Sequence, residues 1–225
     1  MEKPKIWYLE NFNLFKGLTM EQLKYFGMKS SMKKFKKGEF IYFPNELSDK
    51  VFILKDGEIK IGMYTDDGRE LLKTVLRSGE IFGEMALTGE GKRGDFAQAN
   101  DNEVVICVFD VSIVEEMIRQ NPNLSLKITK IIGFRLKTVE NKLASLVFKD
   151  ARTRIVDFLK EQADKYGKPV GLETLIMNNL THKDIASLTA TSRQTVTTVL
   201  NDLRSKNLIY FDRRRILIRD LGKLV

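Results

Sequence analysis

The chain has 225 residues, a formal net charge of +8 and 43% hydrophobic residues, which is enough for two modest folded domains. Its single cysteine, Cys107, excludes a disulfide or a cysteine-ligated iron–sulfur cluster within one chain, and it lies in an apolar run where a buried role is expected. There is no apolar run of membrane-spanning length and no secretory stretch at the amino terminus. We therefore expect a cytoplasmic protein that binds no membrane.

Residues 1–110 have the pattern of short strands separated by glycine turns. Gly38, Gly57 and Gly79 each end a polar turn and are each followed by glutamate and a β-rich segment. A hairpin turn is expected at residues 66–68. The pattern predicts an antiparallel barrel or roll with N-terminal helices, and its clearest strands are residues 50–55, 58–64 and 71–76.

Near the end of this segment, a glutamate and an arginine lie on either side of a glycine-rich loop. A carboxylate and a guanidinium around a short helical turn can hold a hydroxyl group and an anion. Taken alone, the pattern does not identify a ligand. The candidate effector residues in this segment are Gly83, Glu84, Met85, Ala86, Arg93, Gly94 and Asp95.

A long helix is expected to begin near Pro122 and to continue to about residue 147. Its apolar residues alternate at spacings of three and four, which is the pattern of a coiled-coil seam. We expect this seam to form a homodimer, and the alternative is that it packs on the chain's own roll. The seam residues are Thr129, Ile132, Leu136, Val139, Leu143 and Leu146.

Residues 181–204 predict two short helices joined by a tight turn. Thr181 and Asp184 form a near capping box, so the first helix should begin at His182. Ser192 should cap a second helix over residues 193–206. Four apolar residues give the second helix a buried side, which leaves its other side free to face outward. This arrangement is a helix-turn-helix, whose second helix enters the major groove of DNA.

The residues on that outward side suit base recognition. Arg193 can form paired hydrogen bonds with guanine, and Gln194 can do so with adenine. Two short strands around a basic turn at 212–215 then form a wing that contacts phosphates, although an arginine run can also be plain solvated surface. The candidate DNA-binding residues are Thr181, His182, Lys183, Ser192, Arg193, Gln194, Thr195, Thr197, Thr198, Arg213, Arg214 and Arg215.

The distribution of charge along the chain agrees with a DNA-binding segment in the C-terminal part. From Lys149 onward there are 15 Lys and Arg against 9 Asp and Glu, whereas residues 1–148 have 23 against 21. Excess positive charge is typical of DNA-binding segments, because neutralising phosphates releases counterions, although it also serves solubility. His182 is the only histidine, so a metal or haem site built on histidine pairs is unsupported. A surface or phosphate contact is its expected role.

Over nearly its whole length, the chain resembles the Crp/Fnr family of bacterial transcription regulators. The most specific matching stretches are residues 82–84, 150–155 and 192–196. The resemblance implies an α+β fold with a cyclic-nucleotide-binding-like β-roll, a long dimerisation helix and a winged helix-turn-helix. The corresponding divisions are residues 1–110, 111–148 and 149–225. It also implies that an effector in the roll gates DNA binding, and that RNA polymerase is a partner.

Departures from the family pattern bear on the effector. Family members that bind cyclic AMP place Ser or Thr after the phosphate-binding arginine, whereas Gly94 and Asp95 follow Arg93 here. Where those members offer Thr and Ser from the dimer helix, this chain has Val139 and Glu140. Cyclic nucleotide is therefore a disfavoured ligand, and a different small anion or no ligand at all is the alternative. A haem would need an axial ligand other than the usual histidine.

The helix-turn-helix at residues 181–204, called the reader below, also departs from the family pattern. These departures predict a DNA half-site different from that of the cyclic AMP receptor. Gln194 stands where many relatives have glutamate, and Thr198 where they have a second arginine. Ala190 replaces the usual glycine of the turn, which costs about 1 kcal/mol if that residue has positive φ. The sequence contains no recognisable nucleophile–base pair, metal-ligand cluster or P-loop, so an enzyme is not expected. The alternative functions are a ligand-independent regulator with a vestigial pocket and a cyclic-nucleotide-binding signalling protein.

Overall fold

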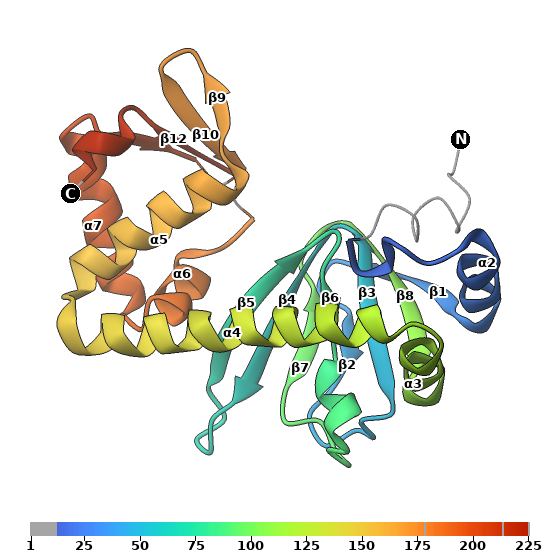
Figure 1. The fold of residues 1–225 in the computed structure, drawn as a ribbon. Coiled ribbons are helices and arrows are strands. Elements are labelled where there is room, and N and C mark those ends of the chain that lie inside the picture. Colours follow the sequence, from blue (N-terminus) through green and yellow to red (C-terminus); the bar gives the residue numbers. More distant parts are fainter. Residues whose placement is uncertain (1–12, 178, 213, 225) are drawn as a thin grey trace. The chain divides into compact units, whose positions relative to one another are not determined.

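The computed structural model describes residues 13–177, 179–212 and 214–224 (Figure 1). The chain divides into two compact units, Met1–Leu136 and Lys137–Val225, and the division falls inside helix α4 (Pro122–Phe148). The first unit is rich in strands and the second combines helices with a small sheet. This agrees with the expected α+β class.

The first unit is a β-roll of two four-stranded antiparallel sheets. One sheet has the order β1-β8-β3-β6, with β1 at Ser31–Lys36, β8 at Glu103–Asp110, β3 at Lys50–Asp56 and β6 at Ile81–Phe82. The other has the order β2-β7-β4-β5, with β2 at Phe40–Tyr42, β7 at Phe96–Ala99, β4 at Glu58–Tyr64 and β5 at Glu70–Arg77. The three clearest predicted strands are confirmed as β3, β4 and β5.

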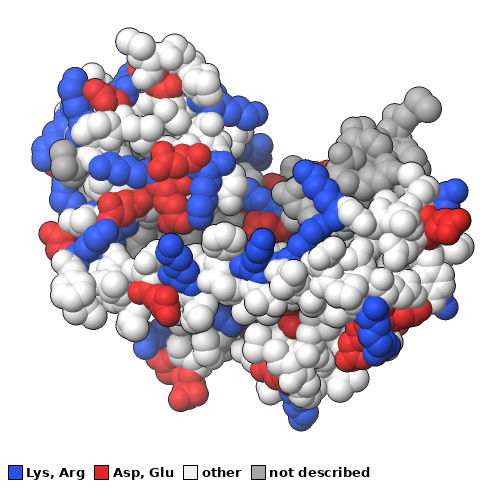
Figure 2. Space-filling model, viewed as in Figure 1, with Lys and Arg blue, Asp and Glu red and all other residues white. Residues whose placement is uncertain are grey.

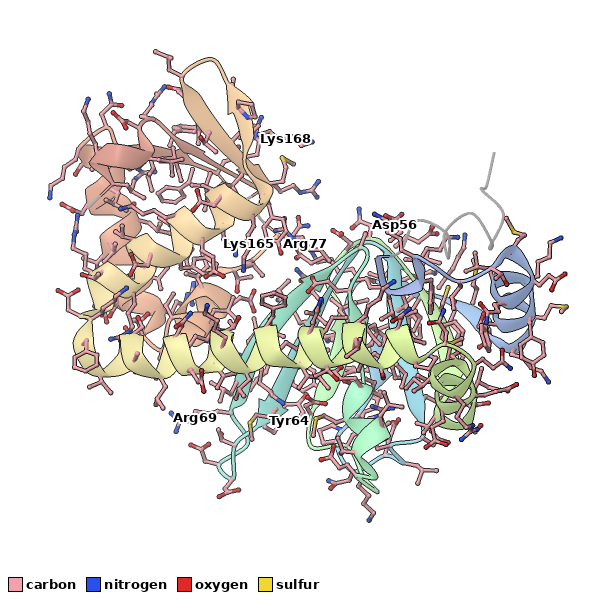
Figure 3. The ribbon with its side chains drawn as sticks, in the orientation of Figure 1. Asp56, Tyr64, Arg69, Arg77, Lys165 and Lys168 are labelled. Atoms are coloured by element: carbon pink, nitrogen blue, oxygen red, sulfur yellow. The ribbon has the colours of Figure 1, made fainter. Side chains whose placement is uncertain are left out.

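The predicted turns are also present. Gly38, Gly57 and Gly79 all have positive φ, and a Cβ at Gly57 would lie 2.8 Å from the Glu103 carbonyl oxygen, so only glycine fits there. The β4–β5 hairpin turns at residues 66–68, as expected. In Figure 3, Tyr64 and Arg69 lie at the tip of this hairpin, and Asp56 and Arg77 lie at its other end.

Two apolar cores lie on the two faces of the β1-β8-β3-β6 sheet. Between the sheets, Phe52, Leu54 and Ile106 pack against residues of the second sheet. On the outer face, Val51 and Cys107 pack against helices α2 (Met20–Lys29), α3 (Val111–Gln120) and the start of α4, and against the short helix η1 (Asn13–Phe15). Because β3 and β8 are covered on both faces, their central residues, 51–54 and 104–109, are all apolar and buried. Cys107 is fully buried, as predicted.

Helix α4 begins at Pro122 and ends at Phe148, which confirms the predicted long helix. Leu124 and Ile128 are buried against the roll, but the apolar residues further along are exposed. Among them, Ile132, Leu136, Val139, Leu143 and Leu146 have exposures of 45–64%. Within the described part of the chain, no helix is both long enough and apolar enough to span a membrane.

Within the described residues, the second unit contains the C-terminal part of α4, three further α-helices, the short helix η3 (Leu221–Lys223) and a four-stranded sheet of order β11-β12-β10-β9. The helices are α5 (Ala151–Tyr166), α6 (His182–Leu188) and α7 (Arg193–Ser205). The two predicted wing strands are β11 (Ile209–Phe211) and β12 (Arg215–Ile218). Their partners β10 (Glu173–Met177) and β9 (Lys168–Val170) were not predicted; they continue the same sheet through the pairing of β10 with β12.

Candidate DNA-binding surface and effector pocket

The two helices of the reader begin where their capping residues predict. The Thr181 hydroxyl accepts a hydrogen bond from the Asp184 amide at 3.2 Å, and the Asp184 carboxylate accepts one from the Thr181 amide at 2.7 Å. This is a complete capping box at the start of α6. Ser192 caps α7 by accepting a hydrogen bond from the Thr195 amide at 3.0 Å.

The turn between the helices contains Ala190 at φ +50°, in the left-handed region. The condition stated from the sequence is therefore met, and the cost is about 1 kcal/mol relative to a glycine. The Thr191 amide donates to the Ala186 carbonyl at 2.9 Å, which holds the turn close against the end of α6. This backbone hydrogen bond helps to hold Ala190 at positive φ, a conformation that alanine adopts less readily than glycine.

Helix α7 has one buried side and one exposed side. Val196, Val199, Leu200 and Leu203 are all buried, as the spacing predicts. Arg193, Gln194 and Thr198 are exposed. Within the described part of the chain, no hydrogen bond or ion pair engages the side chains of Arg193 and Gln194. Their donors are therefore available to base edges.

Thr197 differs from its exposed neighbour Thr198. It is half-buried, and its hydroxyl bonds to the Arg193 carbonyl and to Nδ1 of His182, each at 2.9 Å. If the hydroxyl hydrogen goes to the carbonyl, the imidazole must donate through Nδ1. Burial, and secondarily the charge of Arg193, lowers the pKa of His182, which favours the neutral form of the ring. The Thr197 hydroxyl is therefore engaged within the protein, and its role at the DNA stays a prediction.

The basic turn of the wing is internally paired. Asp212 accepts hydrogen bonds from the amides of Arg214 and Arg215, and these backbone bonds and the Arg215 side chain lower its pKa. The Arg215 guanidinium also donates to the Asp212 carboxylate, at 2.8 and 3.0 Å. Arg214 is exposed, and Arg213 lies outside the described residues. The arginine run is therefore not a uniform cationic patch.

This difference predicts unequal roles on DNA. Replacing Arg214 with Ala should weaken binding equally across DNA sequences and reduce the salt slope of log K by about one unit, as expected for the loss of one phosphate contact. Arg215→Ala should change the slope less, since Asp212 already neutralises Arg215. Titrations at several salt concentrations measure both slopes. A larger slope change for Arg215→Ala than for Arg214→Ala would contradict this ranking.

The candidate effector site in the roll is built around a buried arginine. Arg93 is 5% exposed, its guanidinium lies 4.2 Å from the Tyr42 ring centre and 5.1 Å from that of Phe52, and Nη2 donates to the Lys50 carbonyl at 2.8 Å. In the described structure, no carboxylate forms an ion pair with it. A Cβ at Gly83 would lie 3.0 Å from Arg93 Nη1, so glycine leaves room for the guanidinium. A buried cation without an anionic partner is suited to an anionic ligand.

The two carboxylates of the site each have a partner within the protein. Glu84 forms an ion pair with Arg135 of α4, and the same guanidinium donates to the Ile81 carbonyl. Asp95 accepts from Lys73 at 2.8 Å and from the Tyr42 hydroxyl at 3.2 Å. Burial, and then Asp95, raises the pKa of Tyr42. Lys73 thus reduces the repulsion that Asp95 would exert on a bound anion.

Other candidate residues of the site are placed as follows. Glu84, Met85 and Ala86 form the short helix η2 (Glu84–Thr88), which confirms the predicted helical turn; Ala86 is buried and Met85 is 53% exposed. Gly94 follows Arg93 in the loop before β7. Val139 and Glu140 are exposed and belong to the second unit, so their assignment to the pocket remains a prediction. The described residues contain no group of His, Cys, Asp and Glu that could hold a metal ion.

Comparisons with known proteins match both the β-roll and the helix-turn-helix to known domain families. The cyclic nucleotide-binding domain matches residues 32–121, and the Crp-like helix-turn-helix domain matches residues 153–225. A CRP-like cAMP-activated global transcriptional regulator of Mycobacterium tuberculosis is 30% identical over 190 residues, which cover 84% of each protein. The chain belongs to the Crp/Fnr family of transcription regulators. This confirms the resemblance inferred from the sequence.

Further relatives of this Crp/Fnr regulator extend the match. The cyclic AMP receptor protein of Thermus thermophilus is 26% identical and covers 94% of each chain. A mutant of CooA from Carboxydothermus hydrogenoformans has a TM-score of 0.77 at 25% identity, covering 100% of this chain and 95% of that one. Other relatives are named for nitrogen or anaerobic regulation, so their names indicate no common effector. Regulators of this kind bind DNA and act as dimers.

Both signs of charge occur on the visible face of this regulator's C-terminal unit, with basic side chains along its outer edge (Figure 2). The net positive charge of this part of the sequence is therefore not spread evenly over one face. Individual residues such as Arg193 and Arg214, rather than the overall charge, are the better guides to the DNA contacts.

Proposed function

We propose that this Crp/Fnr regulator binds a two-fold symmetric DNA site as a homodimer and places the first turn of α7 in the major groove of each half-site. The observation that carries this proposal is that Arg193 and Gln194 are exposed and, among the described residues, have no side-chain partner, on a helix whose other side is buried. In helix-turn-helix proteins, the N-terminal residues of the second helix contact base edges.

Each exposed group has a specific role in this proposal. Arg193 reads a guanine and Gln194 reads an adenine, while Thr198 lies against the adjoining bases. Around them, Thr181, Lys183, Ser192 and Thr195 at the two helix starts and Arg213 and Arg214 in the wing contact phosphates, which fixes the register on DNA. His182 and Thr197 support the helix from within, because both are half-buried and bonded to each other.

The dimer in this proposal forms along α4. From Thr129 to Leu146 the seam is exposed in the single chain, although most of its side chains are large and apolar. Leaving such a stripe in water is unfavourable by roughly 25 cal/mol per Å² of apolar surface, and a second copy of the helix would cover it. Paired readers about one turn of DNA apart would then recognise a palindrome.

The effector in this proposal is a small anion bound at Arg93. Its buried guanidinium has no carboxylate partner among the residues that the structure describes, and the nearby Lys73 balances Asp95. Cyclic AMP is one such anion, although Gly94 and Asp95 replace the hydroxyl residues expected after the arginine. We infer regulation of transcription with RNA polymerase as partner, in the cytoplasm and without enzymatic activity, in line with the relatives' names as transcription regulators.

Selection of bound sites from a random DNA pool, using the purified full-length protein with and without cyclic AMP, tests this proposal. We expect a palindromic motif with guanine and adenine in each half-site, and its appearance in the ligand-free arm would show that the protein binds DNA without the anion. A motif that forms only with cyclic AMP would identify that ligand as the effector and contradict our reading of Gly94, Asp95 and Val139. A selected motif without two-fold symmetry would contradict the homodimer.

A further inference from the structure

A single arginine of α5 connects two separate segments of the second unit. The Arg154 guanidinium donates from Nη1 to the Lys149 carbonyl at 2.7 Å, from Nε to the Thr189 carbonyl at 2.9 Å and from Nη2 to the Ala190 carbonyl at 3.0 Å. Lys149 directly follows α4, and the other two residues directly follow α6. One side chain therefore contacts both the α4–α5 junction and the turn before the recognition helix.

The ends of these helices explain why a guanidinium fits. The last carbonyls of a helix lack partners within the helix and carry partial negative charge. Arg154 satisfies such carbonyls at the ends of both α4 and α6. Its donors form a rigid planar fork, so several acceptors can be bound in fixed directions at once, which the point charge of lysine cannot do. In the described residues, Arg154 forms no ion pair with a carboxylate.

The turn that Arg154 holds determines where Arg193 lies. Ala190, at φ +50°, contributes one of the bound carbonyls, and only Thr191 and Ser192 separate it from Arg193. Ser192 begins α7 through its cap on the Thr195 amide. A shift of the Thr189 and Ala190 carbonyls would therefore change the start and direction of the recognition helix.

We propose that Arg154 is a positioning residue that couples the α4–α5 junction to the recognition helix. When the Lys149 carbonyl moves, the rigid guanidinium moves the Thr189 and Ala190 carbonyls with it, and the presentation of Arg193 to DNA changes. Arg154 acts through Arg193 and does not itself contact DNA. The inference rests on the proposed DNA-binding function and adds how the junction after the dimer helix controls the reader.

Binding by full-length variants is the first test. Arg154→Met should reduce the ratio of operator to random-DNA affinity by about tenfold or more, the loss expected when charge-assisted hydrogen bonds are removed. Arg154→Lys should lose most of this ratio too, because an ammonium group cannot hold all three carbonyls. Arg219→Met is the matched control, since it removes an arginine side chain of the same unit whose ion pair is with Glu173 of β10, outside the turn and α7. Full discrimination in Arg154→Met would overturn the proposal.

A second substitution separates positioning from plain stabilisation. Ala190→Gly relieves the positive-φ strain, so adding it to Arg154→Met should raise the melting temperature of the double variant above that of the single variant. The lost discrimination should not return, because the link to Lys149 is still absent. If discrimination recovers together with the melting temperature, Arg154 only stabilises the turn and the proposal is wrong.

Hydrogen exchange on the dimeric protein without DNA tests the link itself. In Arg154→Met, amides of residues 145–150 and of residues 186–192 should both exchange faster than in the unmodified chain. Faster exchange in the turn alone would show that the α4 end is not coupled to it and would overturn the proposal. Because no DNA is present, this result is independent of the proposed function, which fails instead if the unmodified protein selects no DNA sequence.

Discussion

Leu143→Glu on α4 is expected to yield a monomer that no longer binds the operator. Leu143 is 64% exposed in the single chain, so the carboxylate does not disturb the fold of the monomer. In a dimer built on the α4 seam, two such carboxylates would be buried against each other without partners, at a cost of several kcal/mol. Sedimentation velocity measures the association state directly.

Asn141→Glu is the matched control for this experiment. It adds the same charge to the same exposed stretch of α4, but it lies outside the three-and-four spacing of the seam. We expect it to sediment as a dimer and to retain operator binding. If Leu143→Glu also sediments as a dimer, the exposed stripe does not form the subunit interface.

Arg193→Ala is expected to weaken specific binding by about 1–3 kcal/mol, the value of one good paired contact with a base. The selectivity should be lost at a single base pair of each half-site, because the guanidinium has no other partner within the described protein. Binding to a panel of operators with each base pair changed in turn measures this effect. Unchanged selectivity at every position would show that Arg193 does not read a base.

Lys183→Ala provides the comparison for Arg193→Ala. Lys183 is exposed in the first turn of α6, where the first helix of the motif crosses the DNA backbone. Its loss should weaken binding to every operator by a similar factor and reduce the salt dependence. A base-specific effect from Lys183 would show that the reader is docked differently from the proposed geometry.

Local signals in the sequence were sufficient for the elements that form the reader. Thr181 and Ser192 predict helix starts because capping depends on residues only three positions apart. Likewise, the spacing of Val196, Val199 and Leu203 identifies the buried side of α7. For Thr197, the spacing gives the side of the helix but does not show that its hydroxyl bonds to the Arg193 carbonyl and to His182.

Contacts between distant residues could not be predicted in the same way. Arg135 pairs with Glu84 across 51 positions, and Lys73 pairs with Asp95 across 22. Arg154 binds backbone carbonyls, which every residue has and which therefore leave no signal in the sequence. Strand β9 contains Pro169 and lacks an alternating pattern, so its strand conformation depends on pairing with β10.

Because Cys107 is buried, we expect the folded protein to be unreactive toward thiol reagents. Because it is the only cysteine and is fully buried, a cysteine introduced on the surface becomes the single reactive site. Leu172, which is 100% exposed in the turn between β9 and β10, is suited to such a replacement. A symmetric pair of subunits would then carry one fluorophore each at equivalent positions. Energy transfer between them would report directly how the spacing of the two readers responds to DNA or to an anion.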